Sequence, residues 1–144
     1  KVLPEFAFEE LQRHGVGVAM HPAHPLVRAR KVKLEQVARE RLIAFTLADY
    51  PAYHLWMSEL FAPLYFAPQI VEEHGSVRSL IAAVEAGRGV ALVSQRLDCL
   101  AGPRLKISPL QPAPPPLIIG VASRKESRSK AVENFIEAAR SAKR

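Results

Sequence analysis

Residues 46–53 (TLADYPAY) are of types that suit the binding of a small anion. They follow an apolar run that ends at Phe45 and open a helical pattern, so the main-chain amides of Ala52 and Tyr53 are available to a carboxylate. The rings of Tyr50 and Tyr53 can form aromatic walls that carry a hydroxyl group as a polar handle. The candidate binding residues of this stretch are Thr46, Tyr50, Pro51, Ala52 and Tyr53.

Two properties of this stretch leave its role open. The tyrosines can instead pack against the helix that they introduce, with no ligand involved. Asp49 carries a negative charge that disfavours an anion if the side chain points toward it. We therefore expect Asp49 to face solvent.

A second anion-binding candidate is the tripeptide Gly75, Ser76 and Val77, which opens the clearest helical pattern of the chain. The free amides of a helix N-terminus, together with the Ser76 hydroxyl, suit an anionic ligand. The alternative is that Ser76 is an ordinary helix cap. His74, just before it, can add a proton-dependent donor, although a lone histidine is more often structural or solvated.

The sequence predicts neither a metal site nor a cofactor, and no catalytic residues. His21 and His24 lie in a turn broken by prolines, with no identifiable third ligand. Cys99 is the only cysteine, which excludes an intrachain disulfide, and no histidine partner for a nucleophilic thiol is identifiable. The motifs G-x-S-x-G, P-loop and G-x-G-x-x-G are all missing. The sequence therefore lacks the coherent set of nucleophile, base and metal that an enzyme would need.

The composition is that of a globular chain long enough to bury a core: 144 residues, 49% hydrophobic and 24% charged. No apolar run approaches the roughly 18 residues of a membrane span. The net charge of +6 favours acidic partners without choosing between nucleic acid and small anions. Phe135 is the only aromatic residue in the basic stretches 28–41 and 124–144, so we interpret them as solvated helix faces and a polar tail. The chain begins with Lys1, and we expect it to be a fragment or a processed product.

Strand and helix patterns alternate along the chain, which indicates an α/β layered fold with a largely parallel sheet. A stretch with five prolines at 109–116 predicts an extended spacer, in part polyproline II. Ser76 and Gly87 bound the clearest helix. The predicted strands are 16–20, 42–46, 69–73, 90–93, 105–107 and 117–122, and the predicted helices are 34–40, 52–62, 76–87, 94–100 and 127–142.

Four motifs follow one another along the chain, at residues 18–26, 42–53, 76–94 and 117–136. In this order they resemble the effector-binding domain of LysR-type transcriptional regulators. Residues 18–26 (VAMHPAHPL) are similar to the family's strand followed by P-x-H-P-L, and residues 42–53 to its strand and ligand loop. Residues 76–94 (SVRSLIAAVEAGRGVALVS) resemble S-V-x-x-L-x-x-V-x-x-G-x-G-V-A-L-L-P, and residues 117–136 the last strand and helix. Ser94 departs from the family, which commonly has proline there. Its hydroxyl is either a helix cap or a group pointed at the ligand cleft.

The resemblance implies a fold like that of type 2 periplasmic binding proteins, with two lobes and a cleft between them. Each lobe is a three-layer α/β/α structure with a parallel-rich mixed sheet. On this plan the chain lacks the N-terminal winged helix-turn-helix and the start of the first lobe. Its expected parts are 1–9, a crossover from the missing lobe; 10–108, the second lobe; 109–116, a proline-rich crossover; and 117–144, a strand and helix of the first lobe.

The resemblance also implies a function, in which a small anionic effector shifts the lobes of a cytoplasmic bacterial regulator and so controls its binding to DNA. It places residues 46–53 in the family's effector loop. We expect a homodimer, DNA contact only through the missing N-terminal domain, and no membrane partner. A periplasmic solute-binding protein of a transporter is the alternative, since it would share the fold.

Overall fold

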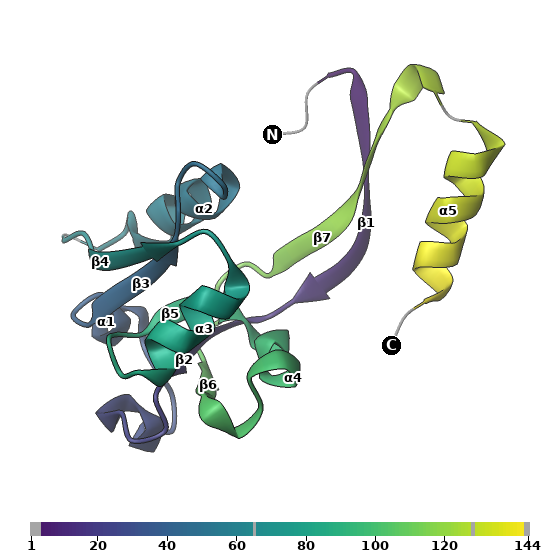
Figure 1. Ribbon diagram of the computed structural model, residues 1–144. Coiled ribbons are helices and arrows are strands. Elements are labelled where there is room, and N and C mark those ends of the chain that lie inside the picture. Colours follow the sequence, from purple (N-terminus) through teal and green to yellow (C-terminus); the bar gives the residue numbers. More distant parts are fainter. Residues whose placement is uncertain (1–3, 65, 128, 143–144) are drawn as a thin grey trace. The chain divides into compact units, whose positions relative to one another are not determined.

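The computed structural model describes residues 4–64, 66–127 and 129–142. The described chain divides into two compact units (Figure 1). One comprises residues 15–115, and the other joins residues 4–14 to residues 116–142. The predicted segments 1–9 and 117–144 also include residues 1–3, 128, 143 and 144, which lie outside the described residues.

The larger unit is built on a mixed sheet of five strands in the order β4-β3-β5-β2-β6. Strand β2 pairs antiparallel with β5 on one side and with β6 on the other, whereas β3 and β4 are parallel. A parallel bridge between Leu42 and Val90 joins β3 to the start of β5, with the Ile43 N–H donating to the Val90 oxygen at 2.8 Å. The strands are β2 (Val16–Met20), β3 (Arg41–Phe45), β4 (Gln69–His74), β5 (Ala91–Ser94) and β6 (Lys106–Pro109).

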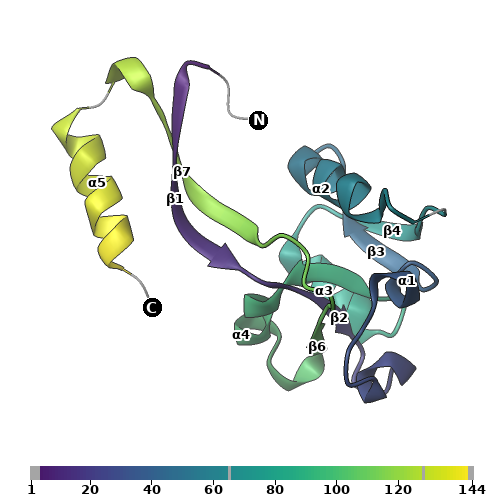
Figure 2. The same cartoon turned by 180° about the vertical axis from the view of Figure 1, so that it is seen from behind.

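Helices lie on both faces of this sheet, as expected for a three-layer α/β lobe. The chain passes from β3 through α2 (Pro51–Phe61) to β4, then returns through α3 (Val77–Glu85) across β3 to β5. Because parallel crossovers are right-handed, these two opposite movements put α2 and α3 on opposite faces. Helix α1 (Leu34–Val37) also lies away from α3, as the two opposite views show (Figures 1 and 2).

The core follows the two-residue alternation of strand side chains. Ile43, Ala91 and Ala19 belong to one buried cluster with Leu80 and Val84 of α3. Leu42, Ala44 and Leu92 are equally buried but point to the other face. Buried residues from α1 and α2 lie outside that first cluster, namely Val37, Met57 and Phe61.

Helix α3 begins and ends as the sequence predicts. The Ser76 hydroxyl oxygen accepts a hydrogen bond from the Ser79 N–H at 3.2 Å. At the other end Gly87 adopts a left-handed φ of 70°, the Gly87 N–H donates to the Val84 oxygen, and the Arg88 N–H donates to the Ala83 oxygen. This is a Schellman motif, which satisfies the last carbonyls of the helix at a position that favours glycine.

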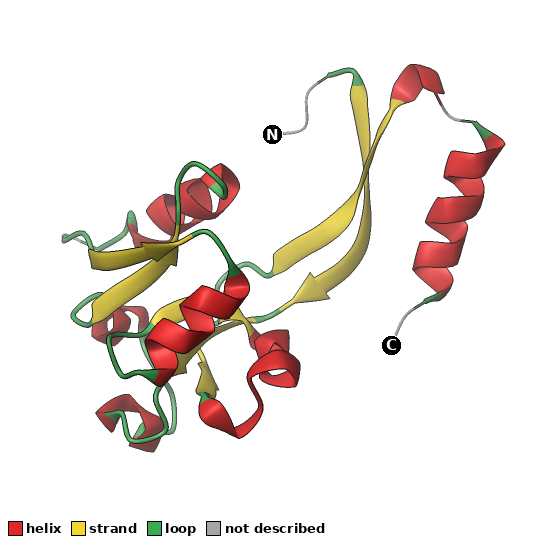
Figure 3. Ribbon diagram, in the orientation of Figure 1, coloured by secondary structure: helices red, strands yellow, loops and turns green. Residues whose placement is uncertain are grey.

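The described part of the smaller unit contains two long antiparallel strands, a short 3-10 helix and one α-helix (Figure 3). Strand β1 (Phe6–His14) pairs with β7 (Leu117–Arg124), with a bulge between Glu10 and Gln12. An ion pair of 2.6 Å between Arg140 and Glu9 ties α5 (Lys130–Ser141) to β1. Several apolar side chains of this unit are exposed: Phe8, Ile118, Ile119 and Phe135.

The remaining differences from the sequence prediction are local. Strand β1 was not predicted, and the predicted helix at 94–100 is a 3-10 turn followed by a single α-helical turn, α4 (Asp98–Ala101). The last strand of the sheet extends into the expected spacer as far as Pro109, which is tolerated because β6 is an edge strand. The 3-10 helices are η1 (Pro25–Arg28), η2 (Gln95–Leu97), η3 (Gly102–Arg104) and η4 (Lys125–Ser127).

Candidate functional site

The candidate binding residues of the larger unit gather at one edge of its sheet. Strands β3, β4 and β5 are parallel, so the loops that follow them leave from the same edge. The loop after β3 leads to a helix on one face, and the loop after β4 leads to a helix on the other. In open α/β sheets such a reversal of direction is where ligands bind, outside the carboxyl ends of the strands.

The loops after β3 and β4 are in direct contact. The Thr46 N–H donates to the His74 oxygen at 3.0 Å. The Thr46 hydroxyl donates to Oδ2 of Asp49 at 2.7 Å, and the Tyr50 N–H donates to the Thr46 oxygen at 2.9 Å. The structure therefore brings the two predicted anion-binding stretches together, although they are separated along the sequence.

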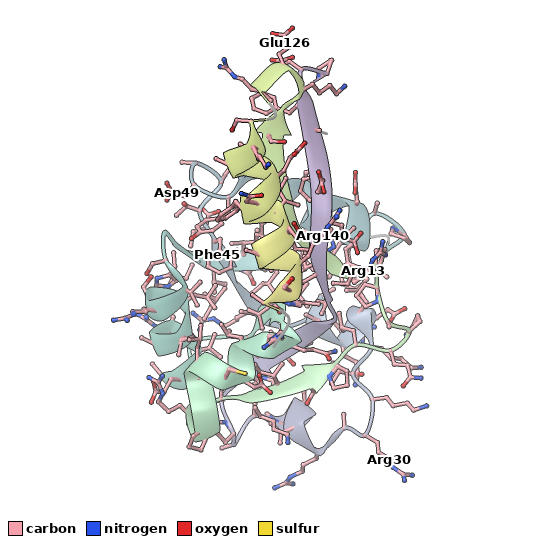
Figure 4. The ribbon with its side chains drawn as sticks, turned by 90° about the vertical axis from the view of Figure 1, so that its right-hand side faces the viewer. Arg13, Arg30, Phe45, Asp49, Glu126 and Arg140 are labelled. Atoms are coloured by element: carbon pink, nitrogen blue, oxygen red, sulfur yellow. The ribbon has the colours of Figure 1, made fainter. Side chains whose placement is uncertain are left out.

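Asp49 is exposed, as expected, but its carboxylate does not point away from the candidate site. A Cβ atom placed on Gly75 would lie 3.0 Å from Oδ2 of Asp49. The Asp49 side chain, which is labelled in Figure 4, thus has its carboxylate beside the residue that precedes the cap of α3. The exposure of Asp49 confirms the prediction that it faces solvent, and its hydrogen bond with Thr46 holds the carboxylate at the contact with the neighbouring loop.

The start of α2 offers one free main-chain donor rather than two. Tyr50 is the N-cap residue and Pro51 occupies the first turn, where a missing N–H is tolerated. The Tyr53 N–H donates to the Tyr50 oxygen at 3.1 Å, so it is already used. Within the described part of the chain, the N–H of the exposed Ala52 makes no hydrogen bond, which leaves it available to a ligand.

The two tyrosines pack around Phe45, a residue that the sequence did not single out. The ring centroid of Phe45 lies 4.4 Å from that of Tyr50 and 5.2 Å from that of Tyr53. The Tyr53 hydroxyl donates to the Leu92 oxygen at 3.1 Å, and burial raises its pKa, so it remains a protonated donor. Tyr53 therefore fits the packing alternative, and its hydroxyl is not offered to a ligand.

Ser76 also performs the simpler of its two predicted roles. Its hydroxyl lies 2.8 Å from that of Ser79, and the Ser79 hydroxyl donates to the Ser76 oxygen at 3.0 Å. These contacts occupy the Ser76 side chain as a helix cap. Gly75 is exposed, and Val77 packs against the core from its partly buried position.

Ser94 caps the 3-10 helix η2, because its hydroxyl oxygen accepts from the Arg96 N–H at 3.2 Å. The next residue, Gln95, forms hydrogen bonds to the start of β2 with both its main chain and its side chain. The Gln95 N–H donates to the Gly15 oxygen at 2.9 Å, and its side-chain amide donates to the Val16 oxygen at 3.0 Å. Ser94 is thus adjacent to the point where the division between the two units falls.

Two histidines beside the site are engaged by carboxylates and by the backbone. Nε2 of His54 lies 2.6 Å from the Phe45 oxygen and 3.3 Å from Glu73. Nε2 of His74 lies 2.9 Å from Glu72, which also contacts Arg88 at 3.1 Å. These contacts make both rings part of the framework around the loops. His54 could have been found from its position one turn after the start of α2.

Within residues 4–64, 66–127 and 129–142, no group of three His, Cys, Asp or Glu side chains is arranged to hold a metal ion. No helix in the described ranges has the length and hydrophobicity needed to cross a bilayer.

The mixed sheet with helices on both faces is that of an α/β lobe, and the chain's likeness to solved effector-binding domains shows the type 2 periplasmic binding-protein-like fold. More specifically, residues 2–144 match the family model described as the LysR substrate binding domain, so the chain belongs to that family. This family is one of transcriptional regulators rather than of enzymes. The match favours the regulator over the transport protein with which it shares the fold.

Individual relatives agree with this assignment. The chain is 28% identical over 120 residues to the HTH-type transcriptional regulator BudR of Raoultella terrigena, covering 83% of this chain and 41% of BudR. It resembles the effector-binding domain of QuiR in complex with shikimate at a TM-score of 0.82 and 22% identity, over 94% of this chain and 64% of QuiR. The BenM effector-binding domain with its effector benzoate gives the same TM-score and identity, over 98% and 64%. The chain therefore spans less than two thirds of these relatives.

Proposed function

We propose that this chain is part of the effector-binding domain of a bacterial LysR-type transcription regulator, and that it binds a small carboxylic acid at the loops after β3 and β4. The observation that carries the proposal is the contact between these two loops through Thr46, His74, Asp49 and Gly75. It assembles a polar site at the place where α/β sheets bind ligands.

The chemistry of the loop after β3 supports a carboxylate ligand. The free N–H of Ala52 lies in the first turn of α2, where the helix dipole favours negative charge. The partly buried ring of Tyr50, supported by Phe45, is suited to cover the apolar part of a small acid. Shikimate and benzoate, the ligands of the related QuiR and BenM domains, are both carboxylic acids.

The exposed apolar surface of the smaller unit supports a lobe that is completed by chain beyond this sequence. Four large apolar side chains of this unit are each more than 40% exposed: Phe8, Ile118, Ile119 and Phe135. In a complete hydrophobic core such side chains are usually buried. We therefore keep the proposed parts: a second lobe at 10–108, crossovers at 1–9 and 109–116, and a strand and helix of the first lobe at 117–144. The winged helix-turn-helix is proposed to belong to the complete regulator.

The proposed mechanism is a shift between two lobe arrangements of the complete domain. An effector changes their populations only if it binds one arrangement more tightly than the other. The shift alters how the DNA-binding domains sit on the operator, and the regulator acts in the cytoplasm as a homodimer. The chain is proposed to bind its ligand without turning it over, because its family is one of regulators.

The test uses the full-length regulator and two variants of the exposed residue Ala52. Ala52→Asp keeps the first turn of α2 stable, since a carboxylate there suits the helix dipole, but it repels an anionic ligand. Ala52→Asn has nearly the same size without the charge and is the matched control. Titration calorimetry with a panel of small carboxylic acids identifies a ligand, and we expect Ala52→Asp to weaken it at least tenfold more than Ala52→Asn. Equal affinities of the two variants would place the carboxylate elsewhere.

A further inference from the structure

Asp49 places a negative charge inside the site that is proposed to bind an acid. Its Oδ2 atom accepts a hydrogen bond from the Thr46 hydroxyl at 2.7 Å and lies 3.0 Å from the position of a Cβ on Gly75. The side chain is exposed, and among the described residues it makes no ion pair. The charge is therefore held at the contact between the two loops without a cation to neutralise it.

This charge acts differently on the two ends of a bound ligand. Two like charges in close contact near a protein surface repel each other, so a second anionic group is excluded from the Asp49 end of the site. A carboxylate has about four acceptor positions, and Thr46 fills one of them. The remaining positions favour a hydroxyl or amino group, which donates a charge-assisted hydrogen bond.

We propose that Asp49 is a specificity-determining residue, and that the effector is a carboxylic acid that also carries a hydroxyl or amino group. The carboxylate of the ligand meets the Ala52 amide at the start of α2, and its donor group meets the Asp49 carboxylate. Thr46 fixes the position of that carboxylate, and Gly75 lets it approach because a side chain there would meet Oδ2. This inference rests on the proposed function.

The experiment compares matched acids on the full-length regulator. Titration calorimetry is run with benzoate and cyclohexanecarboxylate, which lack further donors, and with 3-hydroxybenzoate, 3,4-dihydroxybenzoate and shikimate, which carry hydroxyl groups. The proteins are the wild type, Asp49→Asn and Asp49→Ala. Glu59→Gln is the control, because Glu59 is an exposed carboxylate of α2 outside the site and its loss changes the net charge equally.

We expect the wild type and Glu59→Gln to bind the best hydroxylated acid at least tenfold more tightly than its counterpart without hydroxyls. In Asp49→Asn and Asp49→Ala this ratio falls toward one, because the plain acids bind more tightly and the hydroxylated acids more weakly. Thermal unfolding of each variant confirms that it is folded.

The outcomes separate the two proposals. If both kinds of acid bind and the ratio does not change in either Asp49 variant, Asp49 only braces the loop and this inference is overturned while the acid site stands. A wild-type preference for the plain acids also overturns it. If none of the five acids binds the wild type, the proposed acid site fails and takes the inference with it.

Discussion

The Tyr53 hydroxyl donates a hydrogen bond to the main-chain oxygen of Leu92, 3.1 Å away and 39 positions along the chain. This bond ties the first turn of α2 to β5, the central strand of the larger unit. It also decides the role of Tyr53, whose ring contacts Phe45 while its hydroxyl is occupied. The walls of the site are thus held by the same side chains that the sequence offers as ligand contacts.

Tyr53→Phe is expected to destabilise the protein by about 1 kcal/mol, the usual net contribution of one hydrogen bond, because the ring packing is kept. The raised pKa of Tyr53 adds a pH dependence. The native state holds the proton more tightly than the unfolded chain does, so this stabilisation is complete below about pH 10 and is lost as the pH rises above it. Urea denaturation at pH 8 and at pH 10.5 should show a smaller difference between variant and wild type at the higher pH. An unchanged difference would show that Tyr53 titrates normally.

Ser76 offers a test that separates capping from ligand binding. Ser76→Ala removes the acceptor for the Ser79 N–H and should destabilise the protein by about 1 kcal/mol, the typical value for a lost N-cap. Ser76→Asp restores the cap, and with it the stability, but adds a charge that repels an acid. We expect the effector affinity to fall more in Ser76→Asp than in Ser76→Ala, as measured by calorimetry on the full-length protein. Equal affinities in all three proteins would remove Ser76 from the site.

Substitutions of Gln95 test its hydrogen bonds to the start of β2, next to the boundary between the two units. Gln95→Ala removes the side-chain bond to the Val16 oxygen, with an expected loss of about 1 kcal/mol. Gln95→Glu should lose more at neutral pH, because it directs a negative oxygen at the same carbonyl. The amide hydrogen-exchange rate around Gly15 should be lowest in the wild type, higher in Gln95→Ala and highest in Gln95→Glu. A Glu variant as slow as the wild type would contradict the contact.

Gly89 is expected to resist substitution because of a close approach between strands. A Cβ there would lie 2.3 Å from the Arg41 oxygen, which accepts the Val90 N–H at 2.9 Å. Gly89→Ala should therefore push β3 from β5 and destabilise the protein by about 1–3 kcal/mol, as for overpacked cores. Gly87→Ala is the comparison, since a Cβ at Gly87 meets no atom within 4 Å and only its positive φ is strained, at a cost of about 1 kcal/mol. Chemical denaturation should give a lower free energy of unfolding for Gly89→Ala than for Gly87→Ala.

Local patterns determined much of this protein. The alternation of apolar strands and amphipathic helices predicted the layered α/β fold, and Ser76 and Gly87 predicted both ends of α3 correctly. These features depend on neighbouring residues, through strand periodicity and cap hydrogen bonds, so the sequence carries them directly. The alternation also predicted a largely parallel sheet, whereas β2 pairs antiparallel with both of its neighbours. The order of four motifs was sufficient to indicate the family, which the match over residues 2–144 confirms.

The tertiary structure decided which atoms of the candidate site are free. The sequence offered the Tyr53 amide and hydroxyl and the Ser76 hydroxyl as ligand contacts, and all three are engaged by other parts of the protein. It correctly predicted that Asp49 is exposed, but not that the carboxylate lies beside Gly75. The physical reason is that hydrogen bonds between loops depend on strand order, and the meeting of β3 with β4 brings residues 46–50 next to residues 74–76. No local pattern records that proximity.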